Sequence, residues 1–173
     1  MRITGIETLH ADGGWRILSY VRITTDGGLV GWSEYSEAVW SPGLTPVIRA
    51  LAPFVIGKDP RAFARLSAEL HAATRMVAGG LAHQAVGAIE NACLDLAGKA
   101  AGLPVYRLFG GPVRDRVPLY WSHCGSFRAS RPDVFEQLVG TPPLRSLDGF
   151  KALGEELRAS GYRAAKTNPI VFT

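Results

Sequence analysis

The sequence predicts an α+β domain followed by the beginning of an α/β domain, because two kinds of pattern succeed one another along the chain. Residues 2–32 contain three segments with strand-like patterns, and residues 45–101 carry apolar residues at helical spacings of three and four. From residue 117 onward a strand-like, a helix-like and another strand-like segment follow in turn. We therefore divide the chain into residues 1–116 and residues 117–173.

The first three segments are predicted to form an antiparallel meander. Segments 2–9 and 16–25 are rich in residues that favour strands, and apolar and polar residues alternate in the second of them. Asp26-Gly27-Gly28 provides residues that tolerate positive φ, and the apolar run 29–32 follows at once. A three-stranded sheet results.

The helical region has recognisable start and stop signals. Thr45-Pro46 and Asp59-Pro60 each combine a favoured N-cap residue with proline at the first helical position. The clearest apolar stripe consists of Val86, Ile89, Cys93, Leu96 and Ala100. Gly102 and Pro104 then end this helix. We expect a bundle of helices to accompany the sheet.

The second part of the chain alternates between strand and helix signals. Segment 117–122 is predicted as a strand, and residues 125–147 as a long connection with one short helix. Asp148 is predicted to cap a helix that Gly161 ends, and residues 162–168 are again extended. This order favours a parallel sheet, but one such unit does not distinguish a barrel from a doubly wound sheet.

Composition and charge exclude several classes of protein. Hydrophobic residues make up 47% and charged residues 20% of the 173 positions, which is typical of globular proteins. The net charge of +4 comes from scattered basic residues, so we expect no nucleic-acid partner. No apolar stretch is long enough to span a membrane, and we expect a cytoplasmic protein. The two cysteines, Cys93 and Cys124, fit neither a disulfide framework nor a zinc site and are predicted to be buried thiols.

Three segments resemble the mandelate racemase and muconate-lactonizing group of the enolase superfamily: 21–34 (VRITTDGGLVGWSE), 85–114 (AVGAIENACLDLAGKAAGLPVYRLFGGPVR) and 161–168 (GYRAAKTN). They occur in the family's order. The resemblance implies that residues 1–116 are an enolase-like N-terminal capping domain. It also implies that residues 117–173 are the first strand, helix and second strand of a C-terminal (β/α) TIM-type barrel.

The resemblance implies a reaction and a cofactor for a parent enzyme. The family removes a proton next to a carboxylate and holds the resulting enediolate on a divalent metal, usually Mg²⁺. In the family three carboxylates from the third, fourth and fifth barrel strands bind this metal, and the sequence has no Asp or Glu after Glu156. We therefore expect Mg²⁺ in the parent enzyme but no metal bound to this chain through the family ligands.

The end of the second barrel strand carries the candidate catalytic residues Lys166 and Asn168. The family usually has Lys-x-Lys here, with the second lysine as the base, whereas this chain has Lys-Thr-Asn. Residues two apart in a strand point to the same side. The amide of Asn168 is not a base and can only form hydrogen bonds. Lys166 is predicted to stabilise a carboxylate or enediolate as a cation, with a role as a base as the alternative.

Three aromatic residues are candidates for substrate binding. In the family two loops of the capping domain close over the substrate, and the corresponding loops are about residues 10–16 and 35–43. Trp15, Tyr35 and Trp40 lie in them by this reading. The alternative is a hydrophobic seam that holds the capping domain against the barrel.

Histidines are weaker candidates in the sequence. His123 follows the first barrel strand and could reach the barrel mouth, but a lone histidine beside Cys124 is more often a structural or solvated residue. His71 and His83 lie in or near helices of the first domain, and neither has a partner at metal-ligand spacing along the sequence.

Two classes of function remain. The first is part of a metal-dependent lyase acting on a small carboxylate, most specifically an acid-sugar dehydratase, with a racemase or cycloisomerase as the near alternative. The second is a non-catalytic interaction module. The expected partners are the remainder of the barrel or a companion chain, and further copies in a homo-oligomer.

Overall fold

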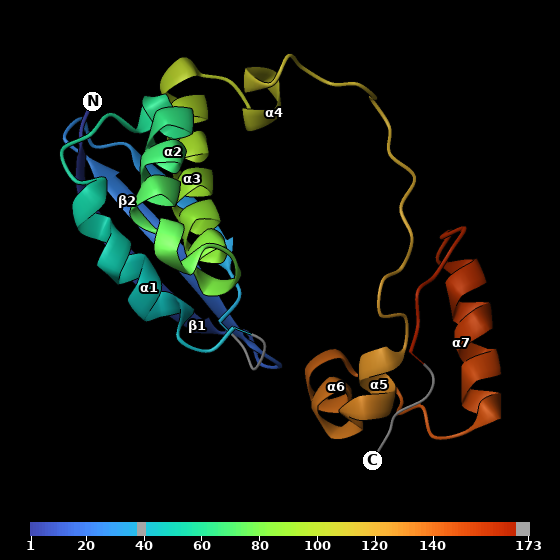
Figure 1. Cartoon of the computed structure of the whole chain (residues 1–173). Helices are drawn as coiled ribbons and strands as arrows, with labels where there is room; N and C mark the ends of the chain where they lie inside the picture. The colour runs from blue at the N-terminus through green and yellow to red at the C-terminus, as the bar shows by residue number, and fades with distance from the viewer. Residues whose placement is uncertain (38–40, 169–173) are drawn as a thin grey trace. The chain divides into compact units, whose positions relative to one another are not determined.

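The computed structural model describes residues 1–37 and 41–168. The chain divides into two compact units, Met1–Val113 and Arg114–Thr173, and each has its own hydrophobic core. Figure 1 shows the sheet and helices of the first unit and the helices of the second.

An antiparallel meander opens the first unit, as predicted. Its strands are β1 (Ile3–Asp12), β2 (Ile17–Thr25) and β3 (Val30–Tyr35), in the order β1-β2-β3. β1 and β3 extend further than the sequence pattern indicated, because β2 continues to offer partners: Asp12 pairs with Ile17, and Tyr35 pairs with Ser19. Pairing with a neighbour thus sets the strand ends, which local sequence does not encode.

Helices make up the rest of the first unit. In chain order they are α1 (Leu44–Leu51), η1 (Ala52–Phe54), η2 (Pro60–Ala62), α2 (Phe63–Ala73), η3 (Arg75–Val77), α3 (Gly80–Ala101) and α4 (Val105–Leu108). Two of the expected boundaries are confirmed: the Asp59 carboxylate accepts a hydrogen bond from the Arg61 N–H at 3.0 Å, and Gly102 ends α3 with a left-handed φ of 65°.

The expected cap at Thr45 is wrong. α1 begins at Leu44, and its N-cap is Gly43, which has a left-handed φ of 86°. The hydroxyl of Thr45 bonds instead to Tyr35 and Glu37, so it does not cap the helix. The helix itself was predicted correctly from local residue preference. Its first residue differs from the prediction because the Thr45 hydroxyl bonds to side chains outside the helix.

The core of the first unit lies where α3 packs against the sheet (Figure 1). The stripe of α3 includes Ile89 and Leu96, both fully buried. Gly31 of β3 allows the close approach, since a Cβ added there would lie 2.3 Å from the carbonyl oxygen of Ala92. Asp95 of α3 accepts hydrogen bonds from the Trp32 N–H at 2.8 Å and the Lys99 ammonium at 2.6 Å. This carboxylate therefore ties α3 to β3.

The second unit contains α5 (Ser126–Ser130), α6 (Pro132–Val139) and α7 (Leu147–Ala159). Trp121 precedes these helices in the sequence and Ala165 follows them, and the two residues form a parallel bridge. A parallel pair of segments joined through a helix is the signature of a β/α unit. The second unit therefore begins with a β/α arrangement of parallel segments.

Three details of the second unit differ from the prediction. Segments 117–122 and 162–168 form one isolated bridge and not two regular strands, because each extended segment has only the other as a described neighbour. The connection holds two helices, α5 and α6, in place of one. The N-cap of α7 is Ser146, whose hydroxyl accepts from the Gly149 N–H at 3.2 Å, and not Asp148.

The core of the second unit is small and centres on Cys124, Leu144 and Leu153. Arg128 supports it from α5: its side chain is only 8% exposed, and it donates to the Pro142 carbonyl at 2.9 Å and to Glu156 of α7 at 2.7 Å. This buried guanidinium links three separate segments of the unit.

Apolar side chains of the first extended segment of the second unit face solvent. Val117 is 68%, Leu119 69% and Tyr120 54% exposed. A parallel sheet is normally covered on both faces, so we expect the isolated chain to associate with itself as its concentration rises. Light scattering coupled to gel filtration checks this, and Leu119→Lys is expected to reduce the association. A monodisperse monomer over the whole concentration range would contradict the expectation.

Both cysteines are buried, as predicted. Burial, with a smaller contribution from Glu90, raises the pKa of Cys93 to about 12, and burial likewise raises the pKa of the Cys124 thiol. Because the thiolate is the reactive form, we expect both cysteines of the folded chain to react slowly with a thiol reagent at pH 8. Both should react quickly in guanidinium chloride. Rapid labelling of either cysteine in the native chain would rule out this packing.

In the part of the chain that the structure describes, no helix is long and apolar enough to cross a membrane.

Candidate functional site

Backbone hydrogen bonds hold Lys166 against the end of the first extended segment of the second unit. Its N–H donates to the Trp121 carbonyl at 2.9 Å, and its carbonyl accepts from the Cys124 N–H at 2.9 Å. A further bond joins the Trp121 N–H to the Ala164 carbonyl at 3.0 Å. Lys166 therefore lies where the two parallel segments end, which is the edge that carries the active site in β/α proteins.

Asn168 is fixed two residues further on. Its N–H donates to the hydroxyl of Ser126, the first residue of α5, at 2.9 Å. Lys166 and Asn168 are both exposed, and their spacing along an extended segment favours side chains on the same side. The sequence did not predict the role of Ser126, because a hydrogen bond between residues 42 positions apart produces no periodic pattern in the sequence.

The ammonium of Lys166 has no hydrogen bond or ion pair within residues 1–37 and 41–168. Glu156, a carboxylate of the same unit, is paired with Arg128 at 2.7 Å. An exposed ammonium that no side chain neutralises can attract a carboxylate ligand.

His123 adopts a backbone conformation that is unusual for a residue with a side chain. Its φ is 54°, and it is the single non-glycine residue with positive φ among the described residues. It lies between Trp121 and Cys124, the two residues whose backbones bond to Lys166. Its ring lies 5.1 Å from that of Phe127. His123 is thus placed beside Lys166 in the chain fold, a position that the sequence suggested and whose strained backbone it did not reveal.

Trp15 lies in the turn between β1 and β2, which covers Gly13 to Arg16 and is shorter than the loop that was expected. The guanidinium of Arg16 lies 4.9 Å from the centroid of the Trp15 ring, within the range of a cation–π contact. Arg16 also pairs with Glu34 of β3 at 3.1 Å. These contacts orient the turn of the first unit, and substrate contact by Trp15 stays a prediction.

Tyr35 does not lie in a loop, contrary to our expectation. It is the last residue of β3 and is 7% exposed. Its hydroxyl bonds to that of Thr45 at 2.6 Å, and burial raises the pKa of the phenol. Core packing thus accounts for Tyr35, and a contact with substrate remains a prediction without a described geometry. Trp40, the third aromatic candidate, lies outside the described residues.

Glu37 organises the chain directly after β3. Its carboxylate accepts from the Gly43 N–H at 3.1 Å and from the Thr45 hydroxyl. Burial by itself would raise the pKa of Glu37, but these hydrogen bonds outweigh it and the pKa is lowered. The ionised carboxylate therefore holds the ends of this segment together.

A family metal site does not fit the described part of the chain. Residues 1–37 and 41–168 contain no group of three or more His, Cys, Asp or Glu side chains that could hold a metal ion.

The fold defines a class of protein: an α+β domain, made of an antiparallel meander and helices, followed by the start of a β/α domain. The family described as "Mandelate racemase / muconate lactonizing enzyme, N-terminal domain" matches residues 13–110. The chain therefore belongs to this family of the enolase superfamily, and the fold class predicted from the sequence is confirmed.

Named relatives and solved structures cover 80–99% of the chain. The chain is 34% identical to the D-galactonate dehydratase of Xanthomonas axonopodis pv. citri (strain 306), and the match covers 99% of this chain and 47% of the relative. A protein of Burkholderia xenovorans LB400 provisionally named an L-alanine-DL-glutamate epimerase is 43% identical with a TM-score of 0.91, over 97% of this chain and 42% of that one. A provisionally named galactarate dehydratase of Agrobacterium radiobacter, solved with sodium and L-malate, is 32% identical with a TM-score of 0.66, over 80% of this chain and 36% of that one. The chain thus spans about half the length of the curated relatives that it matches.

Proposed function

We propose that the chain is the amino-terminal part of an enzyme that removes a proton next to the carboxylate of a small acid, most specifically an acid-sugar dehydratase. The observation that carries the proposal is the position of Lys166. Its backbone is held by Trp121 and Cys124 at the end of two parallel segments, and its ammonium is exposed and has no described counter-ion. The dehydratases among the relatives support the choice of substrate class.

Lys166 acts electrostatically in this proposal. Its positive charge attracts the substrate carboxylate and stabilises the negative charge that develops when the neighbouring carbon loses its proton. Asn168 contributes a neutral hydrogen bond to the same ligand, because its amide can donate but cannot accept a proton from carbon. The backbone bonds to the first segment and to Ser126 keep the two side chains in place.

A racemase or cycloisomerase of the same family is the second candidate. The observation that favours it is the high similarity to the Burkholderia protein provisionally named an epimerase, with 43% identity and a TM-score of 0.91. The dehydratase and the racemase share the first step, loss of the proton, and differ in whether a hydroxyl group then leaves as water or a proton returns to the same carbon.

Mg²⁺ is the proposed cofactor of the complete enzyme. The same Burkholderia protein has been solved with magnesium and fumarate, and a Paracoccus denitrificans member of the family with magnesium. When bound, such an ion would stabilise the negative charge of the enediolate. We expect the 173-residue chain by itself to show no Mg²⁺-dependent turnover, because its described residues offer no carboxylate cluster.

The proposal is tested with the complete enzyme and a panel of acid sugars, D-galactonate and galactarate among them, in D₂O. Formation of a 2-keto acid identifies a dehydratase. Exchange of the α-hydrogen without a 2-keto product identifies a racemase. If neither reaction occurs with any acid in the panel, while the 173-residue chain forms a stable species without a companion chain, the interaction module becomes the better reading.

A further inference from the structure

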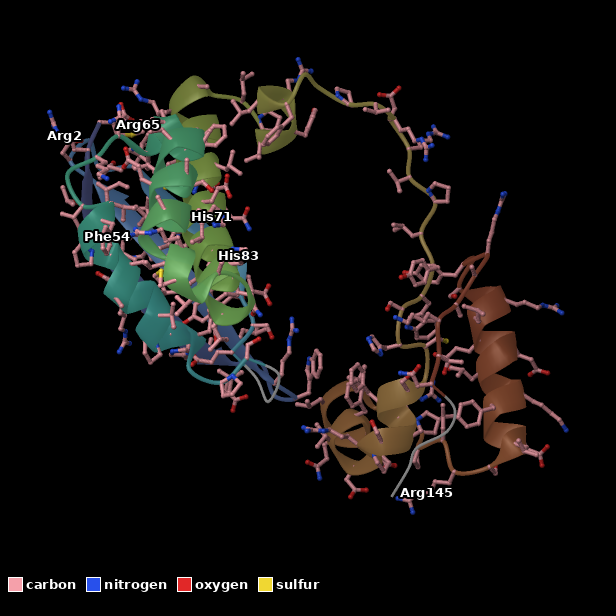
Figure 2. The ribbon with its side chains drawn as sticks, in the orientation of Figure 1. Arg2, Phe54, Arg65, His71, His83 and Arg145 are labelled. Carbon is pink, nitrogen blue, oxygen red and sulfur yellow. The ribbon has the colours of Figure 1, made fainter. Side chains whose placement is uncertain are left out.

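Two histidines that the proposed function does not use lie together on the first unit. His71 belongs to the last turn of α2, and His83 lies in the first turn of α3. Their ring centroids are 4.8 Å apart, and the ring planes are at 86° to one another. Both residues are exposed. Figure 2 shows the two labelled side chains next to each other on adjacent helices.

The helical hairpin, and not a flexible loop, brings the two rings together. α2 and α3 pack against each other and are joined by a short connection, so positions at similar distances from the turn face one another. His71 lies two residues before the end of α2 at Ala73, and His83 three residues after the start of α3 at Gly80. The buried Thr74, whose hydroxyl donates to the Leu70 carbonyl at 2.9 Å, fixes the end of α2.

The separation of the rings suits two imidazoles that bind one metal ion. An imidazole nitrogen lies about 2.0–2.1 Å from a bound Zn²⁺, which places the ring centroid roughly 3.2 Å from the ion. Two such rings at ligand angles of roughly 90–110° have centroids about 4.5–5.2 Å apart. The observed 4.8 Å falls within this range. Binding then requires that one nitrogen of each ring points to the same ion.

The type of the ligand atoms and the surrounding side chains determine which metal ion such a pair would bind. Among the described residues no third His, Cys, Asp or Glu joins the pair to form a larger cluster, so water completes the coordination at this exposed position. Imidazole nitrogen suits Zn²⁺, Ni²⁺ and Cu²⁺, whereas Mg²⁺ prefers oxygen. The buried thiols of Cys93 and Cys124 have raised pKa values and stay protonated, so they do not compete.

We propose that His71 and His83 form a surface chelate for a divalent transition-metal ion such as Zn²⁺, which cross-links α2 and α3. The proposal uses residues of the first unit alone and does not depend on the proposed enzymatic function. Because the ion binds the folded hairpin more tightly than the unfolded chain, it stabilises the first unit by mass action.

Calorimetric titration of the metal-free 173-residue chain with Zn²⁺ tests the proposal. We expect one Zn²⁺ per chain. His71→Gln and His83→Gln should each weaken binding by at least about tenfold, since a single imidazole lacks the gain from a second tethered ligand. The matched control is His10→Gln, which removes another exposed histidine whose ring bonds to the Ser19 hydroxyl at 3.0 Å; its Zn²⁺ affinity should equal that of the wild type.

Thermal denaturation gives a second measurement. Zn²⁺ should raise the melting temperature of the wild type and of His10→Gln, but not of His71→Gln or His83→Gln. Mg²⁺ at the same concentration should leave it unchanged. The proposal is overturned if the wild type binds no Zn²⁺ at submillimolar concentration, or if either single variant binds it as well as the wild type. In both cases the two rings form only an edge-to-face aromatic contact.

Discussion

Replacement of Lys166 by Met in the complete enzyme should lower kcat/KM by about 100- to 1,000-fold, which is the usual cost of losing one preorganised charge contact in the transition state. Met keeps most of the length and the apolar stem of the side chain and removes the charge. The backbone bonds from Lys166 to Trp121 and Cys124 do not involve the side chain, so we expect the free energy of unfolding to change little. Steady-state kinetics and urea denaturation measure the two quantities.

Asn168→Ala is the matched comparison. The amide supplies a neutral hydrogen bond, and the lysine a charge-assisted one, so Asn168→Ala should cost less activity than Lys166→Met. The Asn168 N–H still donates to Ser126 in this variant, because the bond comes from the backbone. Near-normal activity of Lys166→Met would refute the electrostatic role and leave a lysine that only fills the edge of the barrel.

Gly31→Ala should destabilise the first unit by about 3 kcal/mol, at the upper end of the usual cost of overpacking a core. The added Cβ would lie 2.3 Å from the Ala92 carbonyl oxygen and 2.6 Å from Cγ of Leu96. The carbonyl oxygen belongs to the backbone of α3 and cannot rotate away, so the helix must shift from the sheet. Urea denaturation followed by circular dichroism measures the effect.

Gly27→Ala provides the control for this prediction. Gly27 lies in the turn before β3, its φ is not in the left-handed region, and an added Cβ would meet no atom within 4 Å. We expect a change within about 0.5 kcal/mol, as for most surface substitutions. Equal stabilities of Gly31→Ala and Gly27→Ala would show that α3 does not pack on the sheet as described.

Local pattern determined a large part of the fold. The alternation in residues 16–25, the Asp26-Gly27-Gly28 turn and the apolar stripe of α3 each specify an element through nearby residues alone, and all three elements occur as predicted. Ala100, the last residue of the predicted stripe, is exposed and does not join the core. The cap at Asp59 and the left-handed Gly102 could also be predicted from the sequence, because a cap depends on residues within one turn of the helix.

The candidate site could be predicted from the sequence only in part. The family resemblance singled out Lys166 and Asn168, and their spacing of two predicted that both side chains lie on the same side of an extended segment. The sequence did not indicate that Ser126 holds Asn168, nor that Tyr35 is buried against Thr45. Both contacts join residues whose meeting depends on how distant segments pack.

What the sequence by itself determined is the order of the elements and the division into an α+β domain followed by the start of an α/β domain. The family resemblance added the capping-domain class and the candidate lysine at the end of the second parallel segment. The tertiary structure alone decided where β1 and β3 end, which residue caps α1, and which side chains far apart in sequence meet. His71 and His83 illustrate the difference, because each is an isolated histidine in the sequence and they become neighbours only when α2 folds back against α3. Periodicity and capping act within a few residues, whereas contacts across a hairpin depend on the packing of whole elements.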